Sequence, residues 1–225
     1  WVGTASNLSQ DPTLAAASSF VKHANSISSR HLAVTFQDIQ IVGATGKTMW
    51  KDPSWSALMM ASMQASTPVG TPLTRKVPNV VDVKQKSTIT LLDHIEGILK
   101  GGVVAIMPTA TGFWIERSVT SYVDDDNMVL SEVSANESVN TSIRDLRANL
   151  TSLIGTANVA ATKSRIETLT KSRLQQQVVA DIIKAFDKNS IEVVDLGDTY
   201  SVRYTAAPVF PVNFIKLEAT FVAAL

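Results

Sequence analysis

One short segment of the sequence has residues that could bind a phosphate group. Gly43–Thr48 follows a predicted strand and ends in Gly-Lys-Thr, as the phosphate-binding loops of nucleotide hydrolases do. Those loops also need a glycine five positions before the second glycine, so that their backbone amides surround the phosphates. Ile41 stands there, and no helix signal begins at Lys47. We therefore predict a plain turn, and keep a nucleotide-binding protein that uses Lys47 and Thr48 as an alternative.

The histidines give no metal-binding pattern. His23, His31 and His94 fall in different predicted elements, and the spacing of metal ligands is absent. Asp93 and Glu96 are near His94, but one helical turn offers a single pair of ligands, so we expect a solvated histidine. The chain has no cysteine, which excludes disulfides, thiolate catalysis and cysteine-ligated zinc.

The acidic run Asp124–Asn127 does not have the organisation of a calcium loop. Such loops need alternating ligands, a glycine and a distant glutamate, and none of these follows. An exposed turn is expected instead. The Gly-x-Ser-x-Gly signature of serine hydrolases does not occur either. We predict no catalytic residue, no metal and no cofactor, and hence a protein that is not an enzyme.

The end of the chain alternates as a half-buried strand does. The odd positions from 215 to 221 are apolar and the intervening positions are polar. A terminal strand with one apolar face must pair with its own sheet or with the sheet of another chain. The residues of this candidate inter-subunit strand are Asn213, Phe214, Ile215, Lys216, Leu217, Glu218, Ala219, Thr220, Phe221 and Val222.

Helix signals and strand signals alternate through the first half of the chain. Asp11-Pro12 and Asp52-Pro53 each supply an N-cap followed by proline at the first helical position. They predict helices over about 12–29 and from 53 to a point before Pro68. Ser87 caps a third helix, which Gly101-Gly102 closes. The strands predicted here are 31–36, 39–42, 103–107, 113–123 and 128–133.

The second half begins with two predicted helices and ends in strands. Apolar residues step by four and three from Val139 to Leu153, and a longer helix opened by Thr162 is expected to reach Phe186. Strands are predicted at 191–196, at 200–206 and at the chain end. The predicted class is α+β, with mixed sheets flanked by helices and a C-terminal strand block ending in an edge strand.

The charge and composition favour no particular external partner. The chain has 225 residues, of which 45% are hydrophobic, and its 20 basic and 20 acidic residues give a formal net charge of zero. A neutral chain gives no electrostatic argument for binding nucleic acid or an anionic membrane, and no apolar run approaches the length of a bilayer span. Because it starts at Trp1, we expect a piece of a longer protein.

Several segments match one known family in their order and spacing. Arg30–Val34 follows a helix, and Ser56–Ser62 is a small-residue helix that runs into the Pro-Val-Gly loop of Thr67–Thr74. Ile115–Ser121 carries an arginine and threonines, and Pro211–Leu217 opens the last strand. Together these segments resemble the contractile tail sheath proteins of bacteriophages, from about residue 29 onward.

The resemblance implies a structural subunit that polymerises as stacked hexameric rings around a tail tube and contracts to drive the tube through the host envelope. It implies that residues 1–110 are part of the middle sheath domain, without its N-terminal part, and that residues 111–225 are the C-terminal sheath domain. Sheath subunits of this family are linked by terminal segments that add strands to a neighbour's sheet. Ser118 departs from the family, because a glycine is common there.

The implied partners are other sheath subunits, the tail tube protein, and the baseplate and tail terminator proteins, without direct nucleic acid or membrane insertion. The implied location is the virion tail, with assembly in the host cytoplasm. Two alternatives remain besides the nucleotide-binding protein. One is the sheath of a related contractile injection system of the bacteriocin or secretion type. The other is a soluble α+β adaptor whose last strand pairs with its own sheet.

Overall fold

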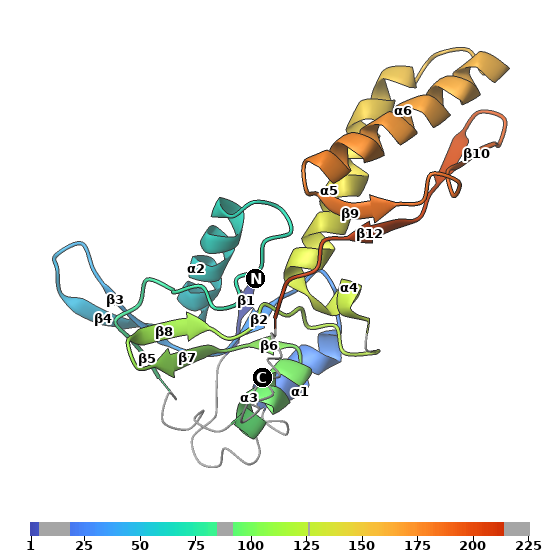
Figure 1. The fold of residues 1–225 in the computed structure, drawn as a ribbon. Coiled ribbons are helices and arrows are strands. Elements are labelled where there is room, and N and C mark those ends of the chain that lie inside the picture. The colour runs from blue at the N-terminus through green and yellow to red at the C-terminus, as the bar shows by residue number, and fades with distance from the viewer. Residues whose placement is uncertain (5–18, 85–91, 126, 214–225) are drawn as a thin grey trace, which may run out of the picture.

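The computed structural model describes residues 1–4, 19–84, 92–125 and 127–213. They form two parts, here called the body and the lobe (Figure 1). The body contains helices α1 (Ser19–Ile27), α2 (Pro53–Ser66), α3 (Leu92–Lys100) and α4 (Met128–Ser131) and strands β1 (Val2–Gly3), β2 (Val34–Thr35), β3 (Ile39–Val42), β4 (Thr48–Lys51), β5 (Asp82–Val83), β6 (Val103–Val104), β7 (Ile106–Thr109) and β8 (Gly112–Ile115).

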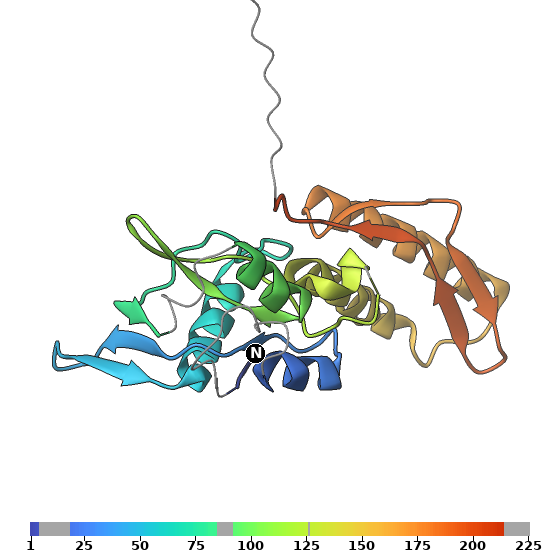
Figure 2. The ribbon, with the colours of Figure 1, turned by 90° about the horizontal axis from the view of Figure 1, so that it is seen from below.

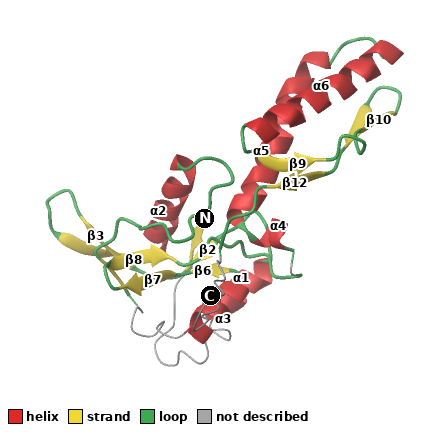
Figure 3. Cartoon of the chain, viewed as in Figure 1, coloured by secondary structure: helices red, strands yellow, loops and turns green. Residues whose placement is uncertain are grey.

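The lobe extends away from the body as a helical hairpin with strands beside it (Figures 1 and 2). Its elements are the 3-10 turn η2 (Thr151–Leu153), α6 (Ala160–Val179), β9 (Ile183–Phe186), β10 (Glu192–Asp195), β11 (Tyr200–Arg203) and β12 (Ala206–Pro208). Helix α5 (Val133–Leu150) begins in the body and ends in the lobe, and so connects them (Figure 3). Helices and several small sheets confirm the predicted α+β class.

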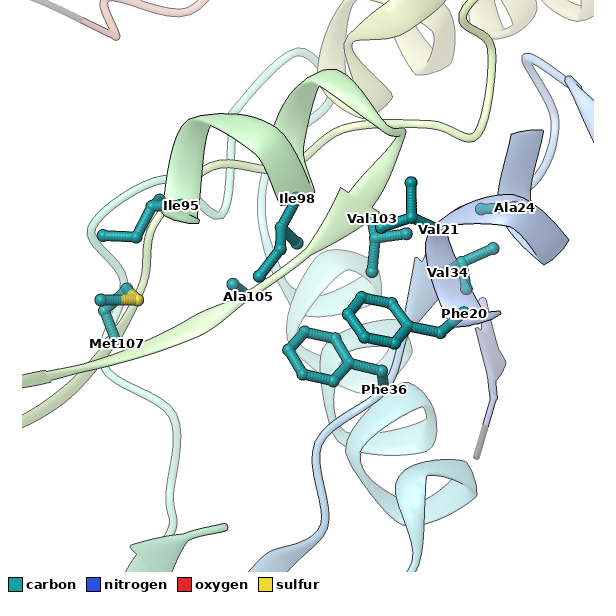
Figure 4. Packing of buried hydrophobic residues seen from close by; sticks show 10 residues of the cluster. All are labelled: Phe20, Val21, Ala24, Val34, Phe36, Ile95, Ile98, Val103, Ala105 and Met107. Carbon is teal, nitrogen blue, oxygen red and sulfur yellow. The ribbon is translucent and has the colours of Figure 1, made fainter. Parts of the chain in front are cut away.

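The body packs three small sheets against its helices. Strands β1, β2 and β6 form a parallel sheet, β4, β3 and β5 an antiparallel one, and β7 and β8 a hairpin. Phe20 of α1 stacks on Phe36 with ring centroids 4.2 Å apart and the planes inclined by 6° (Figure 4). A second apolar cluster contains Ile39, Met60 and Ile115, all almost fully buried.

Two helix boundaries of the body follow the predicted capping signals. Asp52 Oδ1 accepts a hydrogen bond from Ser54 N at 2.9 Å, and α2 starts at Pro53 as expected. Helix α3 ends before Gly102, whose φ of 71° suits glycine. A Cβ at Gly102 would lie 2.8 Å from the Ser121 backbone, so the close approach of these two segments also requires glycine.

Two strand predictions in the body are wrong. The strand expected over 113–123 ends at Ile115, and residues 128–131 of the strand expected over 128–133 form helix α4. Asn127 causes this second difference, because its Oδ1 accepts a hydrogen bond from Val129 N at 3.0 Å and caps the helix. Strand β4, which was not predicted, pairs along β3 from Ile39↔Lys51 to Val42↔Thr48.

In the lobe, the last predicted helix is shorter than expected. Helix α6 ends at Val179, and residues 183–186 form β9 instead of a further helical turn. Asp181 lies between them with a φ of 54°, and this left-handed residue reverses the chain. The strands predicted at 191–196 and 200–206 are present as β10, β11 and β12, with Val193 paired to Val202.

Polar side chains join α5 to α6. Arg173 Nε and Gln177 Nε2 both donate to Asp145 Oδ2 at 2.6 Å, and Ser142 Oγ donates to Gln177 Oε1 at 2.6 Å. Arg173 makes a second bond to the other carboxylate oxygen, which gives the bidentate geometry of a strong pair. The apolar clusters of the lobe are small by comparison.

The apolar clusters separate along the sequence. Those of the body draw their buried members from residues 20–119, and those of the lobe from residues 146–193. The predicted division between residues 110 and 111 falls in the turn of the β7–β8 hairpin and stays a prediction.

Within the described ranges, no helix is both long and apolar enough to cross a bilayer.

Candidate functional site

The predicted inter-subunit strand can be followed only at its first residue. Asn213 is described, and residues 214–222 lie outside the described residues. Asn213 Nδ2 donates to Glu132 Oε1 at 2.9 Å, and Thr74 Oγ1 donates to Asn213 Oδ1 at 3.1 Å. Because Pro208 still belongs to the sheet of the lobe, the chain returns to the body within five residues. The point where the candidate strand begins is therefore attached to the body.

Glu132 is the buried partner in this attachment. Its side chain is 0% exposed between α4 and α5, and its Oε1 accepts a hydrogen bond from Arg117 Nε at 2.5 Å. Burial raises the pKa of the Glu132 carboxyl, while Arg117 and, less strongly, Asn213 act in the opposite direction. A buried carboxylate without such partners is very costly. The hydrogen bond from Asn213 thus satisfies part of the hydrogen-bonding capacity of a carboxylate that is already buried.

The polar atoms around Glu132 are not all satisfied. Among the described residues, Glu132 Oε2, Ser118 Oγ and Ser134 Oγ are buried without a hydrogen-bond partner. An isolated β-bridge joins Val119 to Glu132, and Val133 N donates to Ser118 O, so these groups belong to one junction. The junction joins the extended segment after β8 to the start of α5. It is polar, in contrast to the clusters beside it.

A surface that could receive an extended segment lies in the lobe. Strand β12 pairs with β9 through Ala206↔Phe186, and no described strand pairs with its other edge. A groove of about 760 Å³ runs between α5 and strands β11 and β12. Apolar side chains line much of it, among them Val139, Leu146 and Tyr204. An open strand edge beside an apolar groove suits a peptide that adds a strand and inserts alternate side chains.

The structure does not have the geometry that the phosphate-loop alternative requires. Residues 43–47 form the turn between β3 and β4, and Thr48 begins a strand where a phosphate loop needs a helix. Gly43 N donates to Lys47 O at 2.8 Å and Gly46 N to Gly43 O at 2.9 Å. These amides are used inside the turn and do not surround an empty space. The prediction of a plain turn is confirmed.

The described residues among the histidines and the acidic run form no metal site. His23 and His31 are exposed, but His94 is only 6% exposed, so the prediction that it is solvated is wrong. Asp124 lies at the surface and accepts a hydrogen bond from Ser28 Oγ at 2.7 Å. No group of three or more histidine, aspartate or glutamate residues in the described ranges could hold a metal ion.

Comparison with known proteins gives a consistent picture. No established protein-family profile matches the chain. A predicted tail sheath protein of Enterococcus phage phiEF24C is 26% identical over 170 residues, which are 73% of this chain and 29% of that protein. The chain thus spans less than a third of the length of this relative.

Solved structures extend the likeness to the fold. The sheath tail protein of Desulfitobacterium hafniense has a TM-score of 0.69 at 14% identity, covering 84% of this chain and 44% of that one. The contracted helical sheath of the anti-feeding prophage has a TM-score of 0.66 at 18% identity, covering 85% and 56%. A chain of the baseplate of the same prophage scores 0.67 at 16% identity, covering 87% and 56%. The fold is that of tail sheath proteins, and the resemblance inferred from the sequence is confirmed.

The structure adds residues to this site that the sequence did not identify. Thr74 and Glu132 are 58 positions apart in the sequence, and each bonds to a residue far along the chain from it. A charged residue beside a predicted strand end has the pattern of a surface residue, and nothing in the sequence marks Glu132 as fully buried. Only the three-dimensional arrangement brings them to Asn213.

Proposed function

We propose that this chain is part of a contractile phage tail sheath subunit. In this proposal the subunit forms stacked hexameric rings around a tail tube and contracts to drive the tube through the host envelope. The observation that supports it is the sheath-protein fold, which extends over more than four fifths of the chain. Its role is structural, and residues 1–110 and 111–225 correspond to parts of the middle and C-terminal sheath domains.

The proposed link between subunits is the segment Asn213–Val222. It adds a strand to the open edge of β12 in a neighbouring subunit, or lies beside the strand that does so, with its apolar face toward the groove along α5. Strand addition uses backbone hydrogen bonds along its whole length. Such a link persists while the bodies of the subunits rotate, as contraction requires.

The proposed partners follow from this assembly. They are other copies of the subunit, the tail tube protein, and the baseplate and tail terminator proteins, in the virion tail and, during assembly, in the host cytoplasm. No cofactor is needed, because the energy lies in the difference between two packings of many identical copies.

The linkage is tested in the full-length protein from which this chain comes. We expect deletion of residues 211–225 to prevent the formation of long hollow cylinders in electron micrographs. The paired change Ile215→Lys and Leu217→Lys alters the apolar face and is expected to have the same effect. The matched control is Lys216→Ala with Glu218→Ala, which alters the polar face and should leave the cylinders intact. Normal cylinders from the deletion variant would rule out the linkage.

One alternative assembly has a specific observation in its favour. Sheath and baseplate chains of the anti-feeding prophage share the fold of this chain at TM-scores of 0.66 and 0.67. A sheath of a related contractile injection system therefore fits the same structure. Purified particles distinguish the two: a phage tail is joined to a capsid that contains DNA, and an injection system has no capsid.

A further inference from the structure

One turn of the body has a backbone conformation that is unusual for its residue. Arg75 has a φ of 61°, in the left-handed region that favours glycine. It is the third residue of the turn Leu73–Lys76, which Lys76 N closes by donating to Leu73 O at 2.9 Å. Glycine or asparagine is usual at a third turn position with positive φ. The surroundings must therefore hold the arginine in this conformation.

The side chain of Arg75 supplies that hold. Its guanidinium carbon lies 4.0 Å from the centroid of the Trp114 ring, and its Nη2 lies 2.9 Å from Glu116 Oε1. Trp114 Nε1 donates to Glu116 Oε2 at 2.9 Å, so the three side chains contact one another. We call Arg75, Trp114 and Glu116 the clamp. A glycine would adopt the turn more easily but would lose these contacts.

Backbone bonds fix the same turn from the opposite strand. Arg75 N donates to Ile115 O at 2.8 Å, and Ile115 N donates to Lys76 O at 2.9 Å. Leu73, at the start of the turn, is 0% exposed in the second apolar cluster of the body. Thr74 is thus held between a core residue and the clamp. Its hydroxyl is the group that donates to Asn213 Oδ1.

We propose that Arg75 is a positioning residue for the C-terminal segment. Through the clamp it keeps the turn in the conformation that presents Thr74 Oγ1 to Asn213, and so sets the direction in which the segment leaves the body. The importance of that direction rests on the proposed function, in which the segment links subunits. Asn213 has a second, independent partner in Glu132, so the Thr74 bond orients an end that Glu132 also holds.

The absence of cysteine makes a direct test simple. Val212 is 77% exposed, so a nitroxide on Val212→Cys reports the mobility of the segment by electron paramagnetic resonance. We expect Thr74→Val and Arg75→Gly each to raise the ratio of mobile to immobile label about fivefold, the effect of one lost hydrogen bond. Arg75→Lys keeps a cation over Trp114 and should restore part of the order.

The double variant distinguishes a positioning role of Arg75, which acts through Thr74, from a general effect of Arg75 on stability. If Arg75 acts through Thr74, Arg75→Gly together with Thr74→Val has no larger effect than either change alone. Ser28→Gly is the control, because Ser28 also has a positive φ, of 36°, but contacts Asp124 and Val123 instead of the clamp. It should leave the mobility of the label unchanged.

Two results would overturn the proposal. One is an unchanged mobility of the label in Arg75→Gly; the other is full additivity with Thr74→Val. Neither depends on sheath assembly. A mobile segment in Arg75→Gly, combined with normal cylinders from the deletion of residues 211–225, would support the positioning role and reject the linkage.

Discussion

The body and the lobe are stabilised by different interactions. In the body, two apolar clusters contain most of the buried hydrophobic residues, including the stacked pair Phe20 and Phe36. Each cluster of the lobe has three buried members, and hydrogen bonds to Asp145 also join α5 to α6. Non-directional apolar burial thus contributes more in the body, and directional polar contacts contribute relatively more in the lobe.

This difference is consistent with the proposed role of the lobe as a receiving surface. Its strands occur as two pairs, and an isolated two-stranded sheet is marginal in water. The groove along α5 leaves apolar side chains such as Val139 only partly covered. A strand from a neighbouring subunit would add a third strand to the β9–β12 sheet and would cover the apolar side chains of the groove. The body holds the start of the segment that would supply such a strand.

The largest effect is expected from a change in the body. Phe36→Ala removes a ring that is 0% exposed and stacked on Phe20, and should lower the free energy of unfolding by about 3–5 kcal/mol. Denaturant unfolding measures the loss. Phe36→Leu keeps most of the volume and is expected to cost less than half as much. Equal losses from the two variants would show that the aromatic stack, and not buried volume, stabilises the body.

In the lobe, the corresponding change is polar. Asp145→Ala leaves Arg173 and Gln177 without their acceptor and should cost about 2–3 kcal/mol. Arg173 holds the pKa of the Asp145 carboxyl below its usual range. The stability that this carboxylate contributes is therefore present above pH 3.8 and is lost as pH falls through the lower folded value.

Asp145→Asn separates charge from shape in this network. It should remove that acid-dependent part of the stability while keeping one oxygen acceptor. Amide exchange resolved by segment shows where the loss falls. We expect faster exchange in α5 and α6 and unchanged exchange in β6 and β7. Faster exchange throughout the chain would show that the lobe and the body unfold as one unit, and would end the distinction drawn between them.

Local signals in the sequence predicted the elements whose boundaries depend on neighbouring residues. Asp52-Pro53 gave the start of α2, and Gly101-Gly102 gave the end of α3. The errors lie where short apolar runs suit either a helix or a strand, as at Met128–Ser131, which Asn127 caps as a helix. The chain reversal at Asp181 was missed because no glycine marks it.

The candidate site was less predictable than the fold. The sequence marked Asn213 as the start of a strand, since the alternation after it is local. Its partners Thr74 and Glu132 come from distant segments, and their roles depend on burial and on one hydrogen bond each. The role of Arg75 could not be predicted for another reason, because its positive φ is normally found at glycine. Residues that break a local rule are identified only when the contacts that compensate them are visible.

The junction between body and lobe is expected to respond to pH in the opposite direction from Asp145. Burial raises the pKa of Glu132, so the protonated carboxyl favours the folded state. That contribution is complete below the unfolded value of about 4.5 and is lost as pH rises through the folded value. Glu132→Gln has no carboxyl to ionise, so its stability does not fall in this way as pH rises. Its amide oxygen still accepts hydrogen bonds from Arg117 and Asn213.

The stability of Glu132→Gln relative to the parent chain should therefore improve from pH 4 to pH 7. The change is expected to be smaller than that of Asp145→Ala, because the acceptor remains. Melting temperatures of both proteins across this range measure it. A difference that stays constant with pH would mean that Glu132 has the same pKa in the folded and unfolded chain. The junction would then not shield this carboxyl from water.

The smallest effect is expected at the tip of the lobe. Asn158 Nδ2 donates to Asp195 Oδ1 at 2.9 Å, and its Oδ1 accepts from the hydroxyl of Tyr200. Both contacts are at the surface, where water replaces a lost partner, so Asn158→Ala should cost about 0.5 kcal/mol. The matched change in the body is Asn136→Ala, because Asn136 is 6% exposed and its amide donates to Arg30 O. The Asn136 side chain is almost fully buried, so unfolding experiments should show a several-fold larger loss there. Equal losses would mean that hydrogen bonds contribute alike at both ends of α5, and burial would then not explain the contrast between body and lobe.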